Sequence, residues 1–474
     1  MSLKQEKINW RNPWAIFVAA LCLRLIAMTV GHTYRFSHDM DDFGFGWETG
    51  RIARAIATGR GFSDPLQGHT GPTAWIAPLY PYLLAGIFKV FGVYTLLSSW
   101  VDLAINCLFS ALNAVVIYRV AERLFWRSAA LWSAWIWAAF PYAWYWAIHW
   151  QWETSLATLL LSCAVLLAMR IAGVGRGEFH NPLRPQELGP QTVPRELVPR
   201  RRDWILFGAV NGLIALTNPS VLLWLPCAGV WALLKDRKRE GWRRAGTSAT
   251  LAGLIFVAML APWVTRNWMV FHKLIPVRGN FWVEFHLGNT HGADGLWAWW
   301  MHPSHNGDEL KRYRELGEVG YVARAKALTT AEIARDPRHF AYACLCRVIY
   351  FWYDTPRIDN DLGVFSQVRN LLFAFSSLVA FLGAGLMVRR RRRGAFLLVA
   401  LLITVPLVYY LTFPHPRYRA PLEPMVVVLG VYLFQSAEPE SSRKKHEPST
   451  GENAEISDQG PVADPPGVDR LAGL

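Results

Sequence analysis

Long runs of apolar residues recur along the chain, with short polar segments between them. Each run approaches the roughly 20 residues that an α-helix needs to cross the hydrocarbon core of a bilayer. The pattern therefore predicts an all-α integral membrane protein with about ten transmembrane helices. The runs lie at about 13–30, 98–119, 128–147, 154–173, 204–217, 219–235, 245–264, 366–388, 394–412 and 420–435.

Two further segments, 47–58 and 76–92, are apolar on one face or too short to span. The second begins Ile76-Ala-Pro-Leu-Tyr-Pro-Tyr and holds two prolines. In the first, Ile52 and Ile56 share a face with Trp47 when the segment is helical. We expect both to be helices that lie at the membrane interface within a first outer loop, 31–97.

Two polar stretches lack any periodic pattern. The stretch 171–203 holds five prolines, and 436–474 contains no aromatic residue and is rich in Ser, Glu, Pro and Gly. Such composition cannot bury enough apolar surface to fold. We expect a flexible cytoplasmic loop at 171–203 and a disordered cytoplasmic tail at 436–474, with the membrane domain covering 1–435.

The distribution of charge predicts how the protein is oriented in the membrane. The formal net charge is +14, from 49 Lys and Arg against 35 Asp and Glu. The basic residues gather between apolar runs and form no continuous face for a phosphate backbone, so no nucleic-acid partner is expected. With ten spans every cluster falls on one side, which the positive-inside rule identifies as the cytoplasm. Both termini are then cytoplasmic, in a bacterial-type inner membrane. The clusters are Lys4, Lys7 and Arg11; Arg119, Arg123 and Arg127; Arg200 to Arg202; Lys235 to Arg244; and Arg389 to Arg393.

Carboxylates gather in the first outer loop, on the side opposite the basic clusters, and they are the first candidates for catalytic residues. Asp39, Asp41, Asp42 and Glu48 lie within ten positions. A carboxylate here could act as a general base that takes the proton of an attacking hydroxyl or amine. Asp42 is the first candidate, then Glu48, then Asp41. The alternative is that they are ordinary acids at a helix N-terminus, where the helix dipole favours them.

A second acid, Glu153, begins the fourth span on the same side, directly after Trp152. It could face the first-loop carboxylates across a site. The alternative is a solvated acid within an interfacial belt of tryptophans, which is common in membrane proteins.

Arginines on the outer side are unexpected under the positive-inside rule and therefore need a structural or functional explanation. Arg417 and Arg419 flank Tyr418 before the last span, and Arg266 ends the seventh. Arginine pairs phosphate in a bidentate manner, so these four residues are candidates for holding a donor phosphate. Ion pairs with the outer carboxylates are the alternative.

The outer segment 265–365 is rich in groups that suit sugars. Glu284, Asn289 and Asp294 can hydrogen-bond hydroxyls, and indoles such as Trp152 offer faces on which sugar rings stack. His286, His291, His302 and His305 lack any metal-ligand spacing, so no metal site is expected. No cofactor is required, and a divalent metal stays open without support.

Together these motifs, in this order, resemble a known family. An acidic first outer loop precedes the helix pattern Glu48-Thr-Gly-Arg-Ile-Ala-Arg-Ala-Ile56. Pro78-Leu-Tyr-Pro81, the outer acid Glu153 and Arg417-Tyr418-Arg419 follow. The order resembles the protein O-mannosyltransferase and aminoarabinose transferase group of the C-type glycosyltransferase superfamily, over roughly residues 10–435.

The resemblance implies an inverting hexosyl- or pentosyltransferase that uses a polyprenyl-phosphate sugar donor. The acceptor would be a lipid, glycan or protein, in cell-envelope glycan or lipopolysaccharide synthesis. The family's acidic pair in the first loop corresponds here to Asp41-Asp42. Its Lys-Pro-Pro-Leu stretch appears as Ala77-Pro78-Leu79-Tyr80, without the lysine.

Two rival functions remain, a transporter or flippase of lipid-linked glycan and a glycan polymerase or ligase. A transporter would use ionisable groups near the midplane, for which Arg24, Asp102 and Asn106 are the candidates.

Overall fold

The computed structural model describes residues 11–36, 45–175, 201–354 and 363–437, and within these ranges it is helical with no named strand. Five described helices are long and apolar enough to cross a membrane. They are α1 (Pro13–Val30), α4 (Leu96–Leu124), α7 (Thr154–Ile171), α10 (Trp242–Phe271) and the part Val368–Arg389 of α14 (Gly363–Arg389). The prediction of an all-α, multi-pass membrane protein is confirmed.

The other predicted spans are also helical, but they are shorter or interrupted by proline. The run 128–147 divides into α5 (Arg127–Ala139) and α6 (Pro141–His149). The run 394–412 divides into α15 (Ala395–Thr404) and α16 (Leu407–Leu411), with Pro406 between them. Proline lacks the N–H that continues a helix and clashes with the preceding turn, so each run breaks there. The remaining elements of the bundle are α8 (Arg201–Thr217), η3 (Pro219–Trp224), α9 (Leu225–Glu240), α17 (Pro416–Arg419), η5 (Ala420–Leu422) and α18 (Glu423–Gln435).

Arg24 of α1 compensates for the break between α5 and α6. Its guanidinium donates to the carbonyl oxygens of Trp137 and Ala138, at 3.2 and 3.1 Å, and to Ser110 Oγ at 3.0 Å. Carbonyls that lose their helical partner inside a membrane must find another donor. Arg24 therefore has a structural explanation, which removes one of the residues that a transporter would use.

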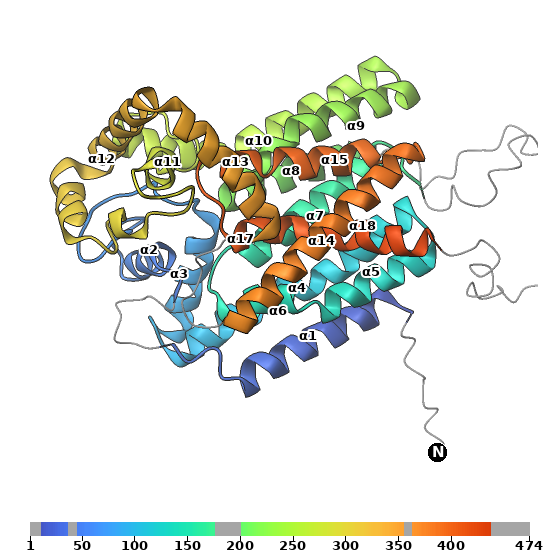
Figure 1. Ribbon diagram of the computed structural model, residues 1–474, viewed down its shortest axis with the longest axis horizontal. Helices are drawn as coiled ribbons and strands as arrows, with labels where there is room; N and C mark the ends of the chain where they lie inside the picture. The colour runs from blue at the N-terminus through green and yellow to red at the C-terminus, as the bar shows by residue number, and fades with distance from the viewer. Residues whose placement is uncertain (1–10, 37–44, 176–200, 355–362, 438–474) are drawn as a thin grey trace, which may run out of the picture. The chain divides into compact units, whose positions relative to one another are not determined.

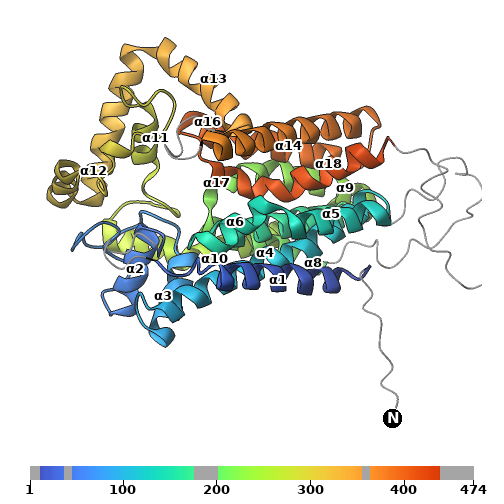
Figure 2. The same cartoon turned by 60° about the horizontal axis from the view of Figure 1, so that its bottom comes forward.

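The two predicted interfacial helices are present and pack against each other as α2 (Glu48–Ala57) and α3 (Leu79–Phe91). The outer segment 265–365 is largely helical, which its sequence did not lead us to expect. It forms α11 (Phe281–Asn289), η4 (Trp299–Met301), α12 (Gly307–Arg335) and α13 (Pro337–Tyr353). In Figures 1 and 2 the long helices run side by side, and α2, α3, α11 and α12 lie beyond one end of them.

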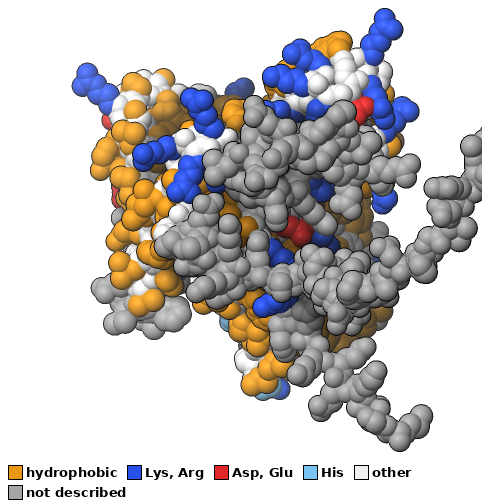
Figure 3. Space-filling model, turned by 90° about the vertical axis from the view of Figure 1, so that its right-hand side faces the viewer, with side chains coloured by type: hydrophobic (Ala, Val, Ile, Leu, Met, Phe, Trp, Pro, Cys, Tyr) orange, Lys and Arg blue, Asp and Glu red, His pale blue; other side chains and the backbone are white. Residues whose placement is uncertain are grey.

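The basic clusters meet at the other end of the long helices. Arg123 at the end of α4 donates to the carbonyl of Val174, 2.7 Å away, just after α7. Val174 in turn lines one hollow together with Lys235 and Arg391. Figure 3 looks onto this end, where Lys and Arg side chains gather. Described residues of three clusters that charge parity assigned to one side thus lie at one end of the long helices. The loop 176–200 and the tail 438–474 lie outside the described residues.

Candidate active site

A close backbone approach joins the first outer segment to the turn before α7. Gly46 has φ +81°, and a Cβ there would lie 2.3 Å from the carbonyl oxygen of Gln151 and 2.9 Å from the Trp152 ring. Only glycine permits both the angle and the contact. Gly46 immediately precedes Trp47 and Glu48, and Trp152 immediately precedes Glu153, so the two predicted acidic segments meet here. The leading base candidates Asp41 and Asp42 lie just upstream, outside the described residues.

A side chain of α4 holds the turn at 150–151 in place by hydrogen bonding. Asn106 Nδ2 donates to the Trp150 carbonyl at 3.3 Å and to Tyr80 Oη at 2.7 Å. The Tyr80 hydroxyl donates to Asp102, 3.0 Å away. Asp102 and Asn106 were the other residues that a transporter would use. Here they form a buried network that holds the outer turn in place.

Arg417 lies over this turn. Its guanidinium carbon is 4.0 Å from the centroid of the Trp152 ring, and Nη2 is 3.3 Å from Tyr418 Oη. The guanidinium is thus in cation–π contact with Trp152. Burial alone would lower the pKa of Arg417, but Tyr418, Glu153 and Glu284 outweigh it and raise the pKa above its ordinary value. Arg417 is therefore a half-buried cation held among acidic groups at the same end as Glu48.

Glu284 of α11 completes the acidic side of the cluster. Asn280 Nδ2 donates to Glu284 Oε1 at 2.8 Å, and Arg278 Nη2 lies 4.0 Å from the same oxygen. Burial raises the pKa of Glu284; the charge of Glu48 raises it further, whereas Arg278 and Arg417 lower it. Three carboxylates and two arginines thus share one electrostatic environment.

Glu48, at the start of α2, has His302 as its partner. His302 Nδ1 accepts a hydrogen bond from the Ser304 backbone N–H at 3.1 Å, which assigns the ring proton of the neutral form to Nε2. That nitrogen lies 3.5 Å from Glu48 Oε1. Burial, followed by the charges of His305 and Arg51, lowers the pKa of His302 to about 3. At neutral pH His302 is thus an uncharged group whose N–H faces the carboxylate, and it can orient Glu48 without neutralising it.

Aromatic rings surround the cluster. Trp150 and Trp152 are stacked at 4.5 Å between ring centroids, and Tyr418 is stacked on Tyr409 at 4.3 Å. Trp47 contacts His305 at 4.7 Å. Exposed aromatic faces of this kind suit the apolar sides of sugar rings. The ring of Trp152 is already in contact with Trp150 and Arg417, so its predicted sugar-binding role stays a prediction.

Arg419 differs from the prediction for it. Its guanidinium pairs with Glu423 at 2.7 Å and donates to Ser376 and Ser377, and the residue is only 1% exposed. All of these partners lie in α14 and α18. Because its donors are used within the bundle, we correct the predicted phosphate role of Arg419 to a structural one.

Three other predicted residues also lie apart from the cluster's contacts. Arg266 of α10 donates to the carbonyls of Thr73 and Phe62, at 2.6 and 2.7 Å, and so ties the connection between α2 and α3 to α10. Asn289 accepts from the buried Arg347 at 3.0 Å and donates to two backbone carbonyls. Asp294 is exposed in a tight turn with φ +51°. We therefore correct the phosphate role of Arg266 and the sugar-binding role of Asn289, whereas the sugar-binding role of Asp294 stays a prediction.

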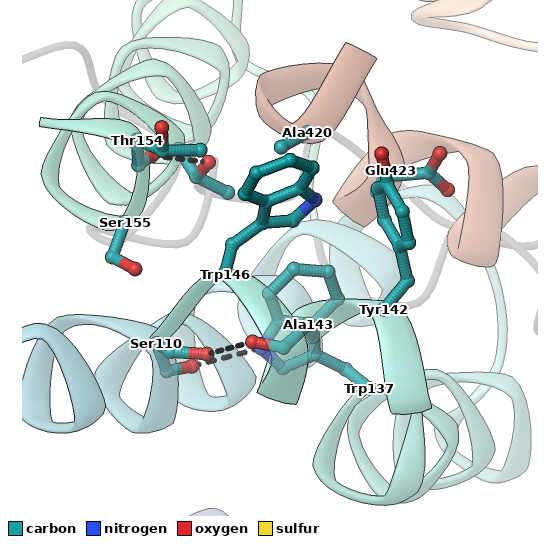
Figure 4. A pocket seen from close by; sticks show the side chains of 10 residues that line it. Ser110, Trp137, Tyr142, Ala143, Trp146, Thr154, Ser155, Ala420 and Glu423 are labelled. Carbon is teal, nitrogen blue, oxygen red and sulfur yellow. Dashed lines mark hydrogen bonds between the residues drawn. The ribbon is translucent and has the colours of Figure 1, made fainter. Parts of the chain in front are cut away.

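A small cavity lies behind the Trp146 ring, toward the bundle (Figure 4). It measures about 20 Å³ and is lined among others by Tyr142, Trp146 and Glu423. The Tyr142 hydroxyl, Trp146 Nε1 and Glu423 Oε2 are buried polar atoms without a partner. The volume suits one water molecule bonded to such groups. It is far too small for a sugar, which leaves the outer cluster as the candidate active site.

Sequence reasoning missed Arg278 and His302. Arg278 lies in an irregular segment without a motif, and His302 was considered only as a metal ligand. Their proximity to Glu284 and Glu48 depends on how the segment 272–306 folds back over α2, which no local pattern encodes. Among the described residues, no three His, Cys, Asp or Glu side chains gather in a way that could hold a metal ion.

No family model matches the sequence, and no curated protein matches it significantly. Solved structures do match. One is the archaeal oligosaccharyltransferase AglB from Archaeoglobus fulgidus, in complex with an inhibitory peptide and a dolichol-phosphate. It is 13% identical with a TM-score of 0.51, over 93% of this chain and 52% of that chain. The apo form of the same enzyme is 13% identical with a TM-score of 0.50, over 94% of this chain and 52% of that chain.

ArnT from Cupriavidus metallidurans, bound to undecaprenyl phosphate, is 15% identical over 88% of this chain and 77% of that one, but its TM-score is only 0.38. The chain spans about half the length of the oligosaccharyltransferase that it matches. The chain shares the fold of part of that oligosaccharyltransferase, and the resemblance drawn from motif order is confirmed at the level of fold.

Proposed function

We propose that the protein is a membrane glycosyltransferase that moves a sugar from a polyprenyl-phosphate donor to a lipid, glycan or protein acceptor. The reaction would take place at the outer face of the cytoplasmic membrane. The observation that carries this proposal is Arg417, which lies on the Trp152 ring among Glu153, Glu284 and Tyr418, at the end of the bundle that also holds Glu48. One cluster thus offers a cation for a phosphate and carboxylates for a proton.

The roles follow from the chemistry of such a transfer. An acceptor oxygen or nitrogen attacks the anomeric carbon, the bond from that carbon to the phosphate oxygen breaks, and polyprenyl phosphate leaves. Arg417, assisted by Arg278, would stabilise the leaving phosphate. A first-loop carboxylate would take the acceptor's proton, with Asp42 first, then Glu48, and then Asp41. A single displacement of this kind inverts the anomeric centre.

Contacts in the bundle disfavour the transporter alternative. Arg24 satisfies broken-helix carbonyls, and Asp102 and Asn106 support the outer turn. Each of these three residues has partners within the protein, whereas Glu48, Glu153, Glu284 and Arg417 of the outer cluster are only partly buried. A polymerase or ligase would share the same site chemistry and differ only in acceptor.

Two measurements test the proposal. In a strain that lacks the protein, the unused lipid-linked sugar should accumulate in the extracted polyprenyl lipids. The purified full chain in nanodiscs should bind undecaprenyl phosphate, the common leaving group, and Arg417→Gln should weaken this binding about tenfold or more, as expected for loss of a charge-assisted pair. Arg417→Lys is the matched control and should recover part of the affinity.

The base is identified by turnover with saturating donor. Asp42→Asn or Glu48→Gln should leave undecaprenyl phosphate binding intact, and the variant that removes the base should lose about 10²–10⁴-fold in rate. If both retain wild-type turnover, Glu153 becomes the candidate. An unchanged lipid pool in the deletion strain, together with no binding of undecaprenyl phosphate, would overturn the function itself.

A further inference from the structure

The basic end of the molecule contains a hollow of about 500 Å³, far from the candidate active site. Glu153 immediately precedes α7 and Gly173 follows it, and the 18 residues of that helix separate the two sites by about 27 Å. The hollow falls within the size range of small-molecule pockets, roughly 300–1,000 Å³.

Six cationic residues from two separate segments line this hollow. Among the described residues, its remaining lining consists of backbone and apolar groups, including Trp231 and Phe396, and contains no carboxylate. The cations are Lys235, Lys238 and Arg239 from the end of α9, and Arg391, Arg392 and Arg393 from the turn between α14 and α15.

Arg239, one of these cations, packs tightly against the backbone. A Cβ at Gly173, where φ is +66°, would lie 1.7 Å from Arg239 Nη1, so the guanidinium rests directly on the backbone that follows α7. Arg391 sits in the left-handed region with φ +50°. The positive-inside rule depends on how many Lys and Arg residues lie near the helix ends. Cations that served only to orient the protein in the membrane would therefore not need to line one hollow together.

Three carboxylates described at this end pair with groups that do not line the hollow, and Asp236 also interacts electrostatically with Arg239. Asp203 pairs with Arg170 at 2.7 Å, Asp236 accepts from Trp204 Nε1 at 2.8 Å, and Glu240 pairs with Arg244. Within the part of the chain that the structure describes, Lys235, Lys238 and Arg391 have no carboxylate partner. The excess charge of the hollow therefore calls for an anion from outside the described chain.

We propose that this hollow is a binding site for a phosphate-bearing ligand, distinct from the candidate active site and independent of the proposed function. Basic pockets between membrane helices on the cytoplasmic side suit phospholipid head groups. Phe396, 55% exposed on the lining, and Val388, 53% exposed at the end of α14, offer apolar surface for acyl chains beside the cations. A soluble diphosphate presents the same chemistry without the chains.

The test compares two variants of the full chain that lose the same number of charges at the same end. The pocket variant is Lys235→Gln, Lys238→Gln and Arg391→Gln. The matched control is Arg237→Gln, Arg243→Gln and Arg244→Gln, none of which lines the hollow. Native mass spectrometry of detergent-purified protein would measure binding of cardiolipin, phosphatidylglycerol, phosphatidylcholine and inorganic diphosphate.

We expect the anionic lipids to bind the wild type, phosphatidylcholine to bind far more weakly, and the pocket variant to lose at least tenfold in cardiolipin affinity while the control changes less than threefold. Binding of inorganic diphosphate with the same variant pattern, but of no anionic lipid, would assign the site to a soluble ligand. Equal losses in both variants, or no binding of any phosphate probe, would overturn the proposal. If the triple variant does not fold, Arg391→Gln alone against Arg243→Gln repeats the comparison.

Discussion

The contact between His302 and Glu48 shows how one buried, uncharged side chain can prepare a carboxylate for proton transfer. The Ser304 N–H fixes the histidine tautomer, and burial keeps the ring neutral, so the Nε2–H of His302 faces Glu48 Oε1 at 3.5 Å. A protonated histidine would instead stabilise the carboxylate by an ion pair and make it a weaker base. The arrangement suits either a base or a residue that positions substrate.

This arrangement predicts a pH-dependent stability. In the unfolded chain His302 titrates near 6.5, and in the folded protein near 3. Between these values the unfolded state binds more protons, so the free energy of unfolding falls as pH drops from 6.5 toward 3. His302→Gln, which keeps a donor toward Glu48, should flatten this dependence by on the order of 2 kcal/mol between pH 6.5 and 4.5. Thermal unfolding in detergent at several pH values measures it. Parallel profiles for the two proteins would show that His302 is not held neutral by the fold.

Individual site residues were predictable from the sequence only where a charge stood out against its surroundings. Arg417 stood out as a candidate because arginines are unusual on the outer side, and Glu153 because it directly follows Trp152 at the start of an apolar run. Arg419, two positions from Arg417, has the same local signal but turns into the bundle toward Glu423. Sequence spacing alone does not tell which side of a short helix such as α17 faces the site.

At the scale of elements, close backbone approach joins α14 to α18. A Cβ at Gly383 would lie 2.4 Å from the Leu429 carbonyl oxygen, and one at Gly430 would meet Val379 at 3.0 Å. Small residues at such crossings let membrane helices pack by van der Waals contact, since lipid gives no hydrophobic drive between them. This pair of helices also carries the Arg419–Glu423 contact, so its spacing supports the segment that presents Arg417.

Gly383→Ala should therefore destabilise the protein by about 1–3 kcal/mol through overpacking. Gly385, in the same helix, provides the control, because a Cβ added there would meet no atom within 4 Å. Gly385→Ala should be neutral or stabilising by up to about 1 kcal/mol, because alanine favours the helix. Midpoints of thermal unfolding, followed by tryptophan fluorescence, compare the two. A Gly383→Ala variant as stable as Gly385→Ala would show that the helices can separate without cost.

Helical spans were predictable because a bilayer requires long apolar runs, and each predicted run coincides with helix. The positions at which these helices are interrupted were not predictable. Pro141 and Pro406 mark the breaks, but proline is tolerated inside membrane helices when neighbours satisfy the freed carbonyls. Arg24 does so for α5 and α6, and only the tertiary structure reveals that partnership. The helices α12 and α13 escaped prediction because they lie in a segment of mixed polarity.

At the scale of the whole molecule, charge divides the two ends of the bundle. Arg123, Lys235 and Arg391 surround one end. Glu48, Glu153 and Glu284 lie at the other, where α2, α7 and α11 begin. The positive-inside rule then assigns the basic end to the cytoplasm and the acidic cluster to the outer face. A lipid-linked donor would be met there, at the membrane–water interface.

This orientation predicts opposite labelling of two exposed positions, Asp294 between α11 and η4 and Arg391 in the basic turn. With the six native cysteines replaced, a membrane-impermeant maleimide added to intact cells should modify Asp294→Cys and spare Arg391→Cys. Permeabilised cells, as the control, should show both labelled. The reverse pattern would place the carboxylates and Arg417 in the cytoplasm, and the proposed outer-face transfer would then be untenable. Two positions lie on the same side when an even number of spans separates them, so labelling of both in intact cells would instead show that a second helix between them, such as α13, crosses the membrane.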